Sequence, residues 1–281
     1  MNFVRARVLI SDSFRDRHLK PGERIVRASN GMRIHLYALN WNEELIVPFF
    51  LRHYEPLVDR MVIYDDGSDD RSLELLAASP KVELRRFAVH GDSFVLSALA
   101  QYNHFWKESR SQADWVIVCN LDEHFYHPHF RDYLEQCSRN QITIVKTKGY
   151  QMVSCEMPPP DAVLVEVISS GVPWHPLDKT AIFNPDAIQE INFDPGRHNC
   201  QPEGIVIYPP EIEVKMLHYK YLGLDYLIER SAELGARMRP ADRRLHYGHQ
   251  YDRSPDAIRQ NFQEMSRQAR PVVAEETEVY R

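Results

Sequence analysis

Cysteine is scarce in this sequence, and its spacing is irregular. The 281 residues include four cysteines, and no two of them form a CxxC pair. A disulfide-stabilised secreted domain has a much higher cysteine density, and a cysteine zinc site needs thiolates at short, paired spacing. We therefore interpret the four side chains as reduced thiols of a cytoplasmic protein. They are Cys119, Cys137, Cys155 and Cys200.

Long apolar runs and an excess of positive charge are also absent. No run approaches the roughly 20 apolar residues that are needed to span a bilayer. Charged residues interrupt the N-terminal stretch where a signal peptide has its apolar segment. The formal net charge is -6, so no global basic field indicates a nucleic-acid partner. These absences argue against a membrane-spanning protein and against a nucleic-acid-binding protein.

Short apolar segments and amphipathic segments alternate in the first half of the chain. Asn40 or Asn42 is expected to cap the first helix, and Asp69 the second. The alternation predicts an α/β fold with a mostly parallel central sheet and right-handed crossovers. The predicted strands cover residues 34–39, 58–64, 82–87 and 115–120, and the predicted helices cover residues 43–54, 71–78 and 93–109.

The second half of the chain is typical of short strands followed by helices. We expect these strands to be antiparallel or mixed. Ser254 and Pro255 form a typical helix start, with a cap and a proline in the first turn. An edge strand at residues 4–10 is a further possibility. The expected strands cover residues 141–147, 162–167, 180–183, 204–208 and 214–218, and the expected helices cover 224–238 and 255–269.

Polar side chains follow three of the predicted strands at the points where these strands end. In an open α/β sheet, ligands bind beside the carboxyl ends of the parallel strands. We therefore expect these side chains to line one cleft. They are Asn40, Asn42 and Glu43 after the first strand, Asp65, Asp66 and Ser68 after the second, and Asn120, Asp122 and Glu123 after the fourth.

The segment from Asp65 to Ser68 has two interpretations. A carboxylate at this place could accept hydrogen bonds from a ribose or from a base N–H, and Gly67 would allow a tight turn close to a ligand. The same residue types also form ordinary turns with a helix cap. The sequence leaves both interpretations open.

Asn120 and Asp122 have the spacing of side chains that leave a strand end on the same side. Their oxygens could hold a hard divalent cation, or they could be a solvated strand exit. His218 ends another apolar run and is either a nitrogen ligand of the same metal, which Mn²⁺ accepts more readily than Mg²⁺, or a buried structural histidine. Lys220 would add positive charge for a phosphate. Three nearby histidines are interpreted as loop residues: His124, His127 and His129.

Taken in order, these motifs resemble glycosyltransferase family 2. The resemblance is strongest to the bacterial branch whose metal motif is Asp-x-Asp-Glu-Phe, and it covers residues 33–125. It continues more loosely through Lys179, His218 and Tyr251. The segments that carry it are 40–44 (Asn-Trp-Asn-Glu-Glu), 63–70 (Ile-Tyr-Asp-Asp-Gly-Ser-Asp-Asp) and 121–125 (Leu-Asp-Glu-His-Phe).

The resemblance implies a GT-A fold and a nucleotide-diphosphate sugar donor that binds together with Mn²⁺ or Mg²⁺. Asp122 would hold the metal, with His218 as a second ligand. The glycosyltransferase domain would cover residues 1–223, with a donor half at 33–125 and an acceptor half at 126–223, and a helical extension would cover 224–281. The residues expected near the donor are Asn40, Asn42, Glu43, Asp65, Asp66, Ser68, Gln101, Asn103, Lys107, Asn120 and Lys220.

The sequence departs from the family pattern at three points. Asn120 replaces the first aspartate of the metal motif, so that the metal affinity should be lower or Asp122 should bind alone. His124 displaces the motif phenylalanine by one position. The Glu-Asp pair that commonly supplies the base is not evident. Because inverting transfer needs a carboxylate within hydrogen-bond reach of the acceptor hydroxyl, Asp178 and Glu123 are the candidates.

We therefore expect a cytoplasmic, inverting glycosyltransferase that acts on a glycan or lipid-linked glycan in surface polysaccharide or lipopolysaccharide synthesis. Trp174 is either a platform for an acceptor sugar or a core residue. Peripheral contact with the inner membrane face would use C-terminal arginines, although a solvated helix face explains them equally well. These arginines are Arg237, Arg239, Arg243 and Arg244.

Two alternative functions belong to other classes of protein. A nucleotidyltransferase usually carries a glycine-rich phosphate loop near its N-terminus, whereas only Gly22 and Gly31 precede the first strand here. A degenerate glycosyltransferase would bind a glycan or a partner protein without turnover. The replacement at Asn120 keeps this second alternative open.

Overall fold

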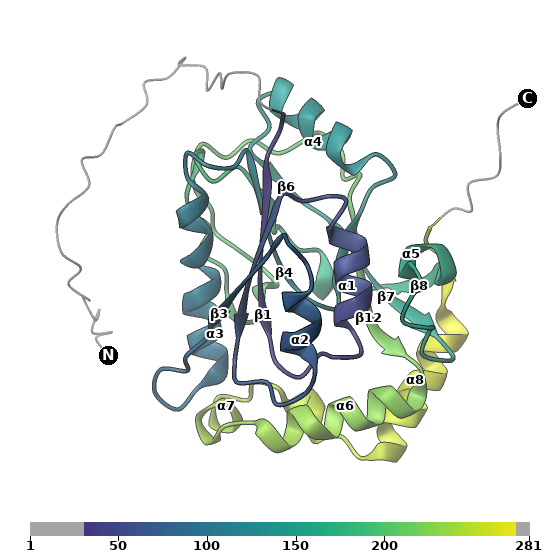
Figure 1. The fold of residues 1–281 in the computed structure, drawn as a ribbon. Helices are drawn as coiled ribbons and strands as arrows, with labels where there is room; N and C mark the ends of the chain where they lie inside the picture. The colour runs from purple at the N-terminus through teal and green to yellow at the C-terminus, as the bar shows by residue number, and fades with distance from the viewer. Residues whose placement is uncertain (1–30, 274–281) are drawn as a thin grey trace, which may run out of the picture. The chain divides into compact units, whose positions relative to one another are not determined.

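A six-stranded sheet lies at the centre of the structure (Figure 1), a computed structural model that describes residues 31–273. Its strand order is β3-β2-β1-β4-β9-β6. The first four strands of this order are parallel, and β9 is antiparallel to β4 and β6. The predicted α/β class with a mostly parallel central sheet is therefore confirmed. The strands are β1 (Ile34–Asn40), β2 (Arg60–Asp65), β3 (Val82–Arg86), β4 (Trp115–Asn120), β6 (Ile144–Val145) and β9 (Ile182–Phe183).

Both faces of this sheet are covered, which explains why its central strands are mostly apolar. Every residue of β1 is buried, and alternate residues contribute to two different cores. Leu36 and Ala38 belong to the core that includes residues of α1 (Val47–Tyr54) and α2 (Ser72–Ala77). Tyr37 belongs to the core on the other face, with residues of α3 (Phe94–Tyr102) and η1 (Phe105–Ser109).

A second sheet has the order β13-β8-β7-β12-β5 and begins directly after β4. Only Leu121 and Asp122 separate β4 from β5, so the chain passes from one sheet to the other at the carboxyl end of β4. β12 is parallel to β7 and antiparallel to β5, which confirms the prediction of mixed later strands. The strands are β5 (Glu123–Tyr126), β7 (Lys148–Ser154), β8 (Ser170–Pro173), β12 (Lys215–Leu222) and β13 (Arg270–Pro271).

The last part of the described chain is helical, as predicted. In Figure 1, α6 and α7 lie along the bottom of the view, below α2 and α3. Ser254 caps the last helix, and its Oγ accepts from the backbone N of Ala257 at 3.3 Å. The division into residues 1–223 and 224–281 stays a prediction. The helices are α6 (Leu224–Arg237), α7 (Pro240–Arg244), η4 (His249–Asp252) and α8 (Pro255–Gln268).

Several local predictions are wrong. Residues 162–167 contain the short helix α5 (Leu164–Val167) and not a strand, because the backbone N of Ile168 bonds the carbonyl of Leu164 four residues earlier. The helix predicted at 93–109 ends at Tyr102 and gives way to η1. The predicted strand at 204–208 shrinks to β11 (Glu203–Gly204). The possible edge strand at residues 4–10 lies outside the described residues. The remaining elements are α4 (Phe130–Arg139), β10 (Ile188–Glu190), η2 (His175–Leu177) and η3 (Pro195–Arg197).

The predicted caps of the first two helices are wrong, because other partners occupy the side chains of Asn40, Asn42 and Asp69. The side chain of Asn40 bonds Asp65, and the side chain of Asn42 bonds Asp69. The first helix begins without a side-chain cap, and its first turn contains Pro48. These asparagine side chains join the loop after β1 to the loop after β2.

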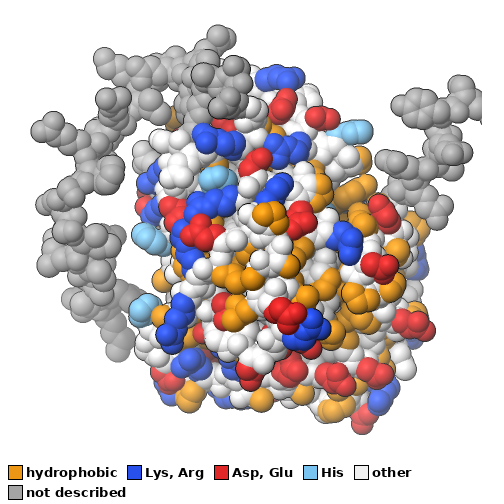
Figure 2. All heavy atoms as spheres, viewed as in Figure 1, with side chains coloured by type: hydrophobic (Ala, Val, Ile, Leu, Met, Phe, Trp, Pro, Cys, Tyr) orange, Lys and Arg blue, Asp and Glu red, His pale blue; other side chains and the backbone are white. Residues whose placement is uncertain are grey.

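Neither the helices of the described residues nor the face shown in Figure 2 indicates a membrane segment or a field of one sign. None of the helices in residues 31–273 is long and apolar enough to cross a membrane. On the face that carries α1 and α2, acidic and basic side chains are interspersed (Figure 2). Three of the four C-terminal arginines form ion pairs inside the chain, so we do not propose membrane contact through them. These three are Arg237 with Asp66, Arg243 with Asp252, and Arg244 with Asp92.

Candidate functional site

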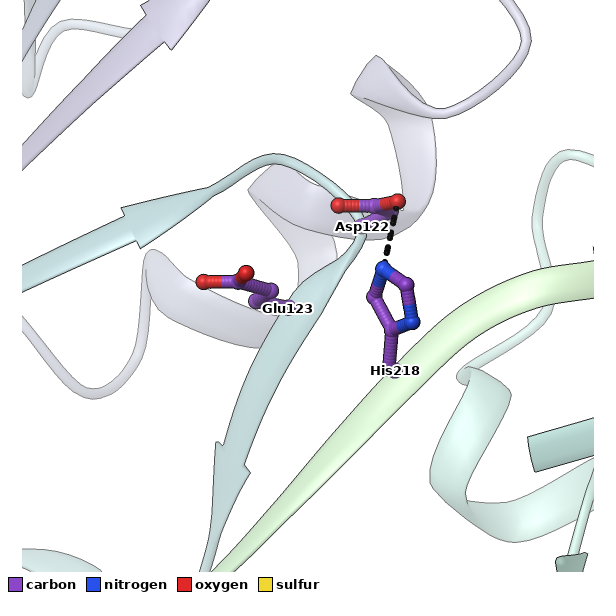
Figure 3. A group of neighbouring side chains, drawn as sticks. All are labelled: Asp122, Glu123 and His218. Atoms are coloured by element: carbon purple, nitrogen blue, oxygen red, sulfur yellow. Dashed lines mark ion pairs between the residues drawn. The ribbon is translucent and has the colours of Figure 1, made fainter. Parts of the chain in front are cut away.

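Asp122 and His218 meet at the point where the two sheets join. Asp122 lies in the turn between β4 and β5, and His218 lies on β12 opposite Glu123. His218 Nε2 is 2.9 Å from Asp122 Oδ2 (Figure 3). Burial by itself would raise the pKa of Asp122, but the adjacent His218 lowers it below its ordinary value. The side chain of Asp122 is 25% exposed, so its carboxylate remains accessible.

The other nitrogen of His218 has a partner that orients the ring. His218 Nδ1 is 2.8 Å from Oε1 of Gln151, which lies on β7 next to β12. An amide oxygen can only accept, so Nδ1 donates and Nε2 is directed to Asp122. Metal-ligating histidines commonly have their second nitrogen fixed in this way. A carboxylate oxygen and an oriented imidazole nitrogen fit a divalent cation such as Mn²⁺.

Glu123 lies next to this pair but is closed to a metal. Asp122, Glu123 and His218 have possible ligand atoms within 4.8 Å of one another. However, Oε1 of Glu123 accepts from the ammonium of Lys179, and Oε2 accepts from Arg197 at 2.9 Å. The side chain of Glu123 is 1% exposed. Asp122 and His218 are therefore the open members of the group.

The environment of Glu123 is also unsuited to a general base. Burial by itself would raise its pKa, but the charges of Arg197 and Lys179 hold the pKa well below its ordinary value. A base needs a carboxylate that can take a proton and reach the acceptor. The predicted role of Glu123 in proton transfer therefore has no support in this geometry. Its charge instead holds Lys179 and Arg197 in place.

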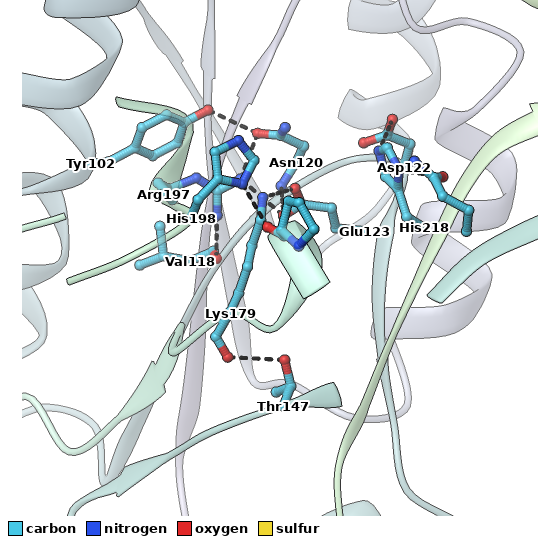
Figure 4. Close-up of polar contacts among 12 residues, drawn as sticks. Tyr102, Val118, Asn120, Asp122, Glu123, Thr147, Lys179, Arg197, His198 and His218 are labelled. Carbon is cyan, nitrogen blue, oxygen red and sulfur yellow. Dashed lines mark hydrogen bonds and ion pairs between the residues drawn. The ribbon is translucent and has the colours of Figure 1, made fainter. Parts of the chain in front are cut away.

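Arg197 is the centre of the buried network around Glu123 (Figure 4). Its guanidinium donates to the carbonyl of Val118 at 2.7 Å, to Asn120 Oδ1 at 2.8 Å and to Glu123. It also lies over the ring of Tyr102, with 4.5 Å between the guanidinium carbon and the ring centroid. Sequence reasoning missed Arg197 because it belongs to the short turn η3, 74 residues after Glu123.

Lys179 completes the network from the segment that follows η2. Its carbonyl accepts from the backbone N of Thr147 at 3.0 Å and from the Thr147 hydroxyl at 2.9 Å. Its ammonium reaches Glu123 from there (Figure 4). The side chain is 3% exposed. Sequence comparison placed Lys179 only in the looser part of the resemblance and gave it no role.

Asp65 and Asp66 have different surroundings despite being neighbours. Asp65 Oδ1 accepts from Asn40 at 2.8 Å and from the Ser68 hydroxyl at 2.6 Å, and its Oδ2 accepts from the backbone N of Gly67 and Ser68. Asp65, Asn40 and Ser68 therefore hold the turn after β2 together. Asp66 has no part in these bonds and faces the helix α6.

Helix α6 approaches the strand ends through two arginines. Arg237 donates to Asp66 Oδ2 at 2.5 Å, and Arg230 donates to Glu43 Oε1 at 2.5 Å. Both guanidinium groups also lie over the ring of Trp41, at 4.0 Å and 5.2 Å from its centroid. Burial raises the pKa of Glu43 to about 7, against the lowering effect of Arg230. The rim of the sheet is thus covered by charge pairs with the C-terminal region.

The remaining predicted donor residues divide into two groups. Asn103 and Lys107 are bound to the segment before η3, since Asn103 Oδ1 accepts from the backbone N of Phe193 at 2.7 Å and Lys107 pairs with Glu190 at 2.6 Å. Their side chains are occupied elsewhere. Lys220 lies on β12, two residues after His218, with its ammonium 5.0 Å from the centroid of the Tyr251 ring. Burial lowers the pKa of Lys220, and Asp122 acts in the opposite direction. The predicted donor contacts of Gln101, Asn103, Lys107 and Lys220 stay predictions.

Asp178 lies at the start of the segment that carries Lys179. Its Oδ1 accepts from the backbone N of Gly149 at 2.7 Å, and its Oδ2 is 3.0 Å from His175 Nδ1.

The nearby Trp174 is 45% exposed, which fits a surface platform better than a core residue. His124, interpreted as a loop residue, is instead buried on β5 and stacks on His53 with ring centroids 4.4 Å apart.

Comparison with known proteins yields structural neighbours only. No protein-family model and no curated protein matches this chain. Among solved structures, glucosyl-3-phosphoglycerate synthase from Mycobacterium tuberculosis in complex with Mg²⁺ and UDP has 18% identity and a TM-score of 0.38, covering 60% of this chain and 62% of that chain. S. aureus TarS 1-349 has 9% identity and a TM-score of 0.37, covering 73% of this chain and 65% of that chain. The chain thus spans less than two thirds of the length of either, and similarity at this level assigns no function.

Proposed function

We propose that this chain is a metal-dependent glycosyltransferase of GT-A type that takes a sugar from a nucleotide-diphosphate donor. The observation that carries the proposal is the pairing of Asp122 and His218, 2.9 Å apart, at the carboxyl end of β4. This edge of the sheet is where ligands of open α/β folds bind. Asp122 comes from the turn between β4 and β5, and His218 comes from β12, which pairs with β5, so the pairing of these two strands creates the site.

Asp122 and His218 would hold Mn²⁺ or Mg²⁺, with Gln151 orienting the histidine. A metal at this place would neutralise the charge of the departing nucleoside diphosphate. Lys220, close enough to Asp122 for the two charges to interact, adds a second positive charge on the same side. Asp66 and Glu43 would contact the nucleoside, and Asp65, Asn40, Asn42 and Ser68 would keep the loops that carry them in place.

The acceptor would enter from the side of η2. Asp178 is the remaining candidate for the base, and a bond from His175 Nδ1 to its Oδ2, 3.0 Å away, would hold the carboxylate in place. The exposed Trp174 would provide an apolar face for an acceptor sugar. We propose inversion at the anomeric carbon and a glycan or lipid-linked glycan acceptor in surface polysaccharide or lipopolysaccharide synthesis in the cytoplasm.

A thermal-shift screen tests the donor site directly. UDP, GDP, ADP and dTDP would each be added with and without Mn²⁺ to the wild type and to Asp122→Ala. A nucleotide at 100 times its dissociation constant should add about 2.7 kcal/mol to the free energy of unfolding. We expect a Mn²⁺-dependent shift with one nucleotide, lost in Asp122→Ala and in His218→Ala.

Asp132→Ala is the matched control, because Asp132 is an exposed aspartate on α4. It should keep the full Mn²⁺-dependent shift. The absence of a shift with all four nucleotides would overturn the proposed function. A shift that needs no metal and survives in Asp122→Ala would retain a nucleotide site but remove the metal from it.

A second candidate function is donor or glycan binding without turnover. The observation that favours it is that the carboxylate oxygens of both predicted bases already have partners. Glu123 is buried in ion pairs, and both oxygens of Asp178 form hydrogen bonds. Hydrolysis of a nucleotide sugar by the wild type, dependent on Mn²⁺ and followed by chromatography of the released nucleotide, would exclude this candidate. Binding without any turnover would favour it.

A further inference from the structure

Asn120 is the position that departs from the metal motif. The surrounding residues determine which way its side-chain amide is oriented. Its Oδ1 accepts from the Tyr102 hydroxyl at 2.8 Å and from Arg197 at 2.8 Å. A guanidinium has only donors, so the amide atom that faces it must be the oxygen. The orientation therefore follows from chemistry, even though amide oxygen and nitrogen are hard to tell apart by shape.

Arg197 is itself fixed in place. It is bound to the carbonyl of Val118 and to Glu123, and its side chain is 1% exposed. Glu123 Oε2 also accepts from the backbone N of Asn120 at 3.1 Å. Both the backbone and the side chain of Asn120 are thus attached to one buried ion pair, which leaves the amide little freedom to turn over.

The two lone pairs of the Asn120 oxygen are both used by these donors. A carbonyl oxygen offers two acceptor positions, and a metal would need one of them. The amide nitrogen is the group that remains. Nδ2 has no hydrogen-bond partner among residues 31–273. It is also not one of the buried polar atoms in this range that lack a partner, so it is not enclosed by the protein. Figure 4 shows it on the side of the amide away from Tyr102, at the same sheet edge as Asp122.

We infer that Asn120 presents an N–H donor, and not a metal-ligating oxygen, at the edge of the sheet where Asp122 lies, and that Arg197 and Tyr102 act as positioning residues that determine the orientation of its amide. The inference rests on the proposed function and deepens it. The ligand atom that it implies is an oxygen acceptor, either a phosphate oxygen or a sugar hydroxyl of the donor. Among residues 31–273, the side chains that would hold the metal are then those of Asp122 and His218.

Calorimetric titration of Asn120→Ala tests this inference. The probes are the nucleoside diphosphate selected by the thermal-shift screen (UDP, GDP, ADP or dTDP) and its glucose conjugate, each titrated at several Mn²⁺ concentrations. Loss of one hydrogen bond should weaken binding about tenfold. If the acceptor is a phosphate oxygen, both probes weaken equally, and if it is a sugar hydroxyl, only the conjugate weakens. Either pattern supports the inference.

The Mn²⁺ dependence separates a hydrogen-bond donor from a metal ligand. We expect the Mn²⁺ concentration that gives half of the maximal binding to be unchanged in Asn120→Ala, whereas Asp122→Ala should raise it or abolish binding. A rise in Asn120→Ala comparable to that in Asp122→Ala would overturn the inference. Wild-type affinity of Asn120→Ala for both probes would also overturn it, while leaving the proposed function intact.

A pair of tyrosine variants tests the positioning role. Tyr102→Phe removes the hydroxyl that bonds Asn120, and Tyr221→Phe removes a hydroxyl that bonds the side chain of Asn261 on α8 at 2.7 Å. Both variants lose the same type of bond and should lose similar thermal stability. Only Tyr102→Phe should weaken probe binding, about threefold, because Arg197 still holds the amide. Equal probe affinity in the two variants would overturn the positioning role.

Failure of the inference and failure of the proposed function have different signatures. If the wild type binds none of the four nucleotides, the proposed function is wrong and the inference falls with it. If the wild type binds one of them with Mn²⁺ but Asn120→Ala binds it and its conjugate equally well, only the inference is wrong. Asn261→Ala, which also loses an amide bonded to a tyrosine, should bind both probes like the wild type.

Discussion

Two neighbouring carboxylates, Asp122 and Glu123, have opposite environments. Glu123 is 1% exposed and is paired with the two cations Lys179 and Arg197, whereas Asp122 is 25% exposed and, within the described part of the chain, has one ion-pair partner, the imidazole of His218. A fully paired and buried carboxylate has no free oxygen for a ligand, and an open one does. The difference shows that one acidic motif supplies both the support of the site and its reactive edge.

The largest expected effect comes from removing the buried charge. Glu123→Gln would leave Lys179 and Arg197 buried without a counter-charge, and breaking a buried ion pair costs about 3–5 kcal/mol. Asp122→Asn should change the free energy of unfolding by less than about 1 kcal/mol, because Asp122 is partly solvated. Urea denaturation without metal would compare the two variants. Equal midpoints would show that the contrast between the two carboxylates is wrong.

The histidines show the same contrast, since His218 lies in the open pair with Asp122 whereas His53 is buried. Burial lowers the pKa of His53 from 6.5 to about 4, against the raising effect of the Phe125 carbonyl. The stability that neutral His53 contributes is therefore fully present above about pH 6.5 and is lost as the pH falls towards 4. The groups that face His53 are the stacked His124 and the ring of Tyr54.

His53→Gln keeps an N–H donor for Phe125 but does not titrate. Between pH 7.5 and pH 4, the wild type should lose about 3 kcal/mol more stability than this variant, as a pKa difference of this size implies. Urea denaturation of both proteins at several pH values would measure the difference. Parallel pH profiles would show that the imidazole titrates normally in the folded state.

A smaller effect is expected for Gln151, which orients the His218 ring of the Asp122–His218 pair. Gln151→Leu removes the acceptor that orients His218, and loss of such an outer partner typically costs about 10–100-fold in metal affinity. Mn²⁺ titration in the presence of the selected nucleotide would measure it. Gln189→Leu, an exposed glutamine on β10, is the control. Unchanged Mn²⁺ affinity in Gln151→Leu would indicate that His218 does not bind the metal.

The smallest effect is expected at the rim. Arg237→Gln removes the ion pair with Asp66 and the contact with Trp41, and both groups are partly solvated, so the free energy of unfolding should fall by about 1 kcal/mol. Arg244→Gln, at a side chain 70% exposed and 3.7 Å from Asp92, should have almost no effect. Equal free energies of unfolding for the two variants in urea denaturation would mean that the Arg237–Asp66 pair contributes no more than the exposed Arg244–Asp92 pair.

Part of the fold was predictable because local pattern and burial agree. The apolar runs of β1, β2 and β4 are buried on both faces, and Ser254 with Pro255 starts α8 as expected. The caps of the first two helices were wrong because a neighbouring loop, and not the helix start, supplies the partners of their side chains, whereas the strand at 162–167 was wrong because local backbone bonds form the short helix α5 there. Asn42, for example, bonds Asp69 on the next loop.

The sequence by itself determined the parallel strands and the polar residues at their carboxyl ends, because hydrophobic period and residue type are local properties. Only the tertiary structure decided which of these residues are open. It brought His218 on β12 to Asp122 in the turn before β5, and Arg197 and Lys179 to Glu123 from segments far away in the chain. Ion pairs between residues far apart in the chain leave no period or spacing in the sequence, since they depend on where the packed loops lie.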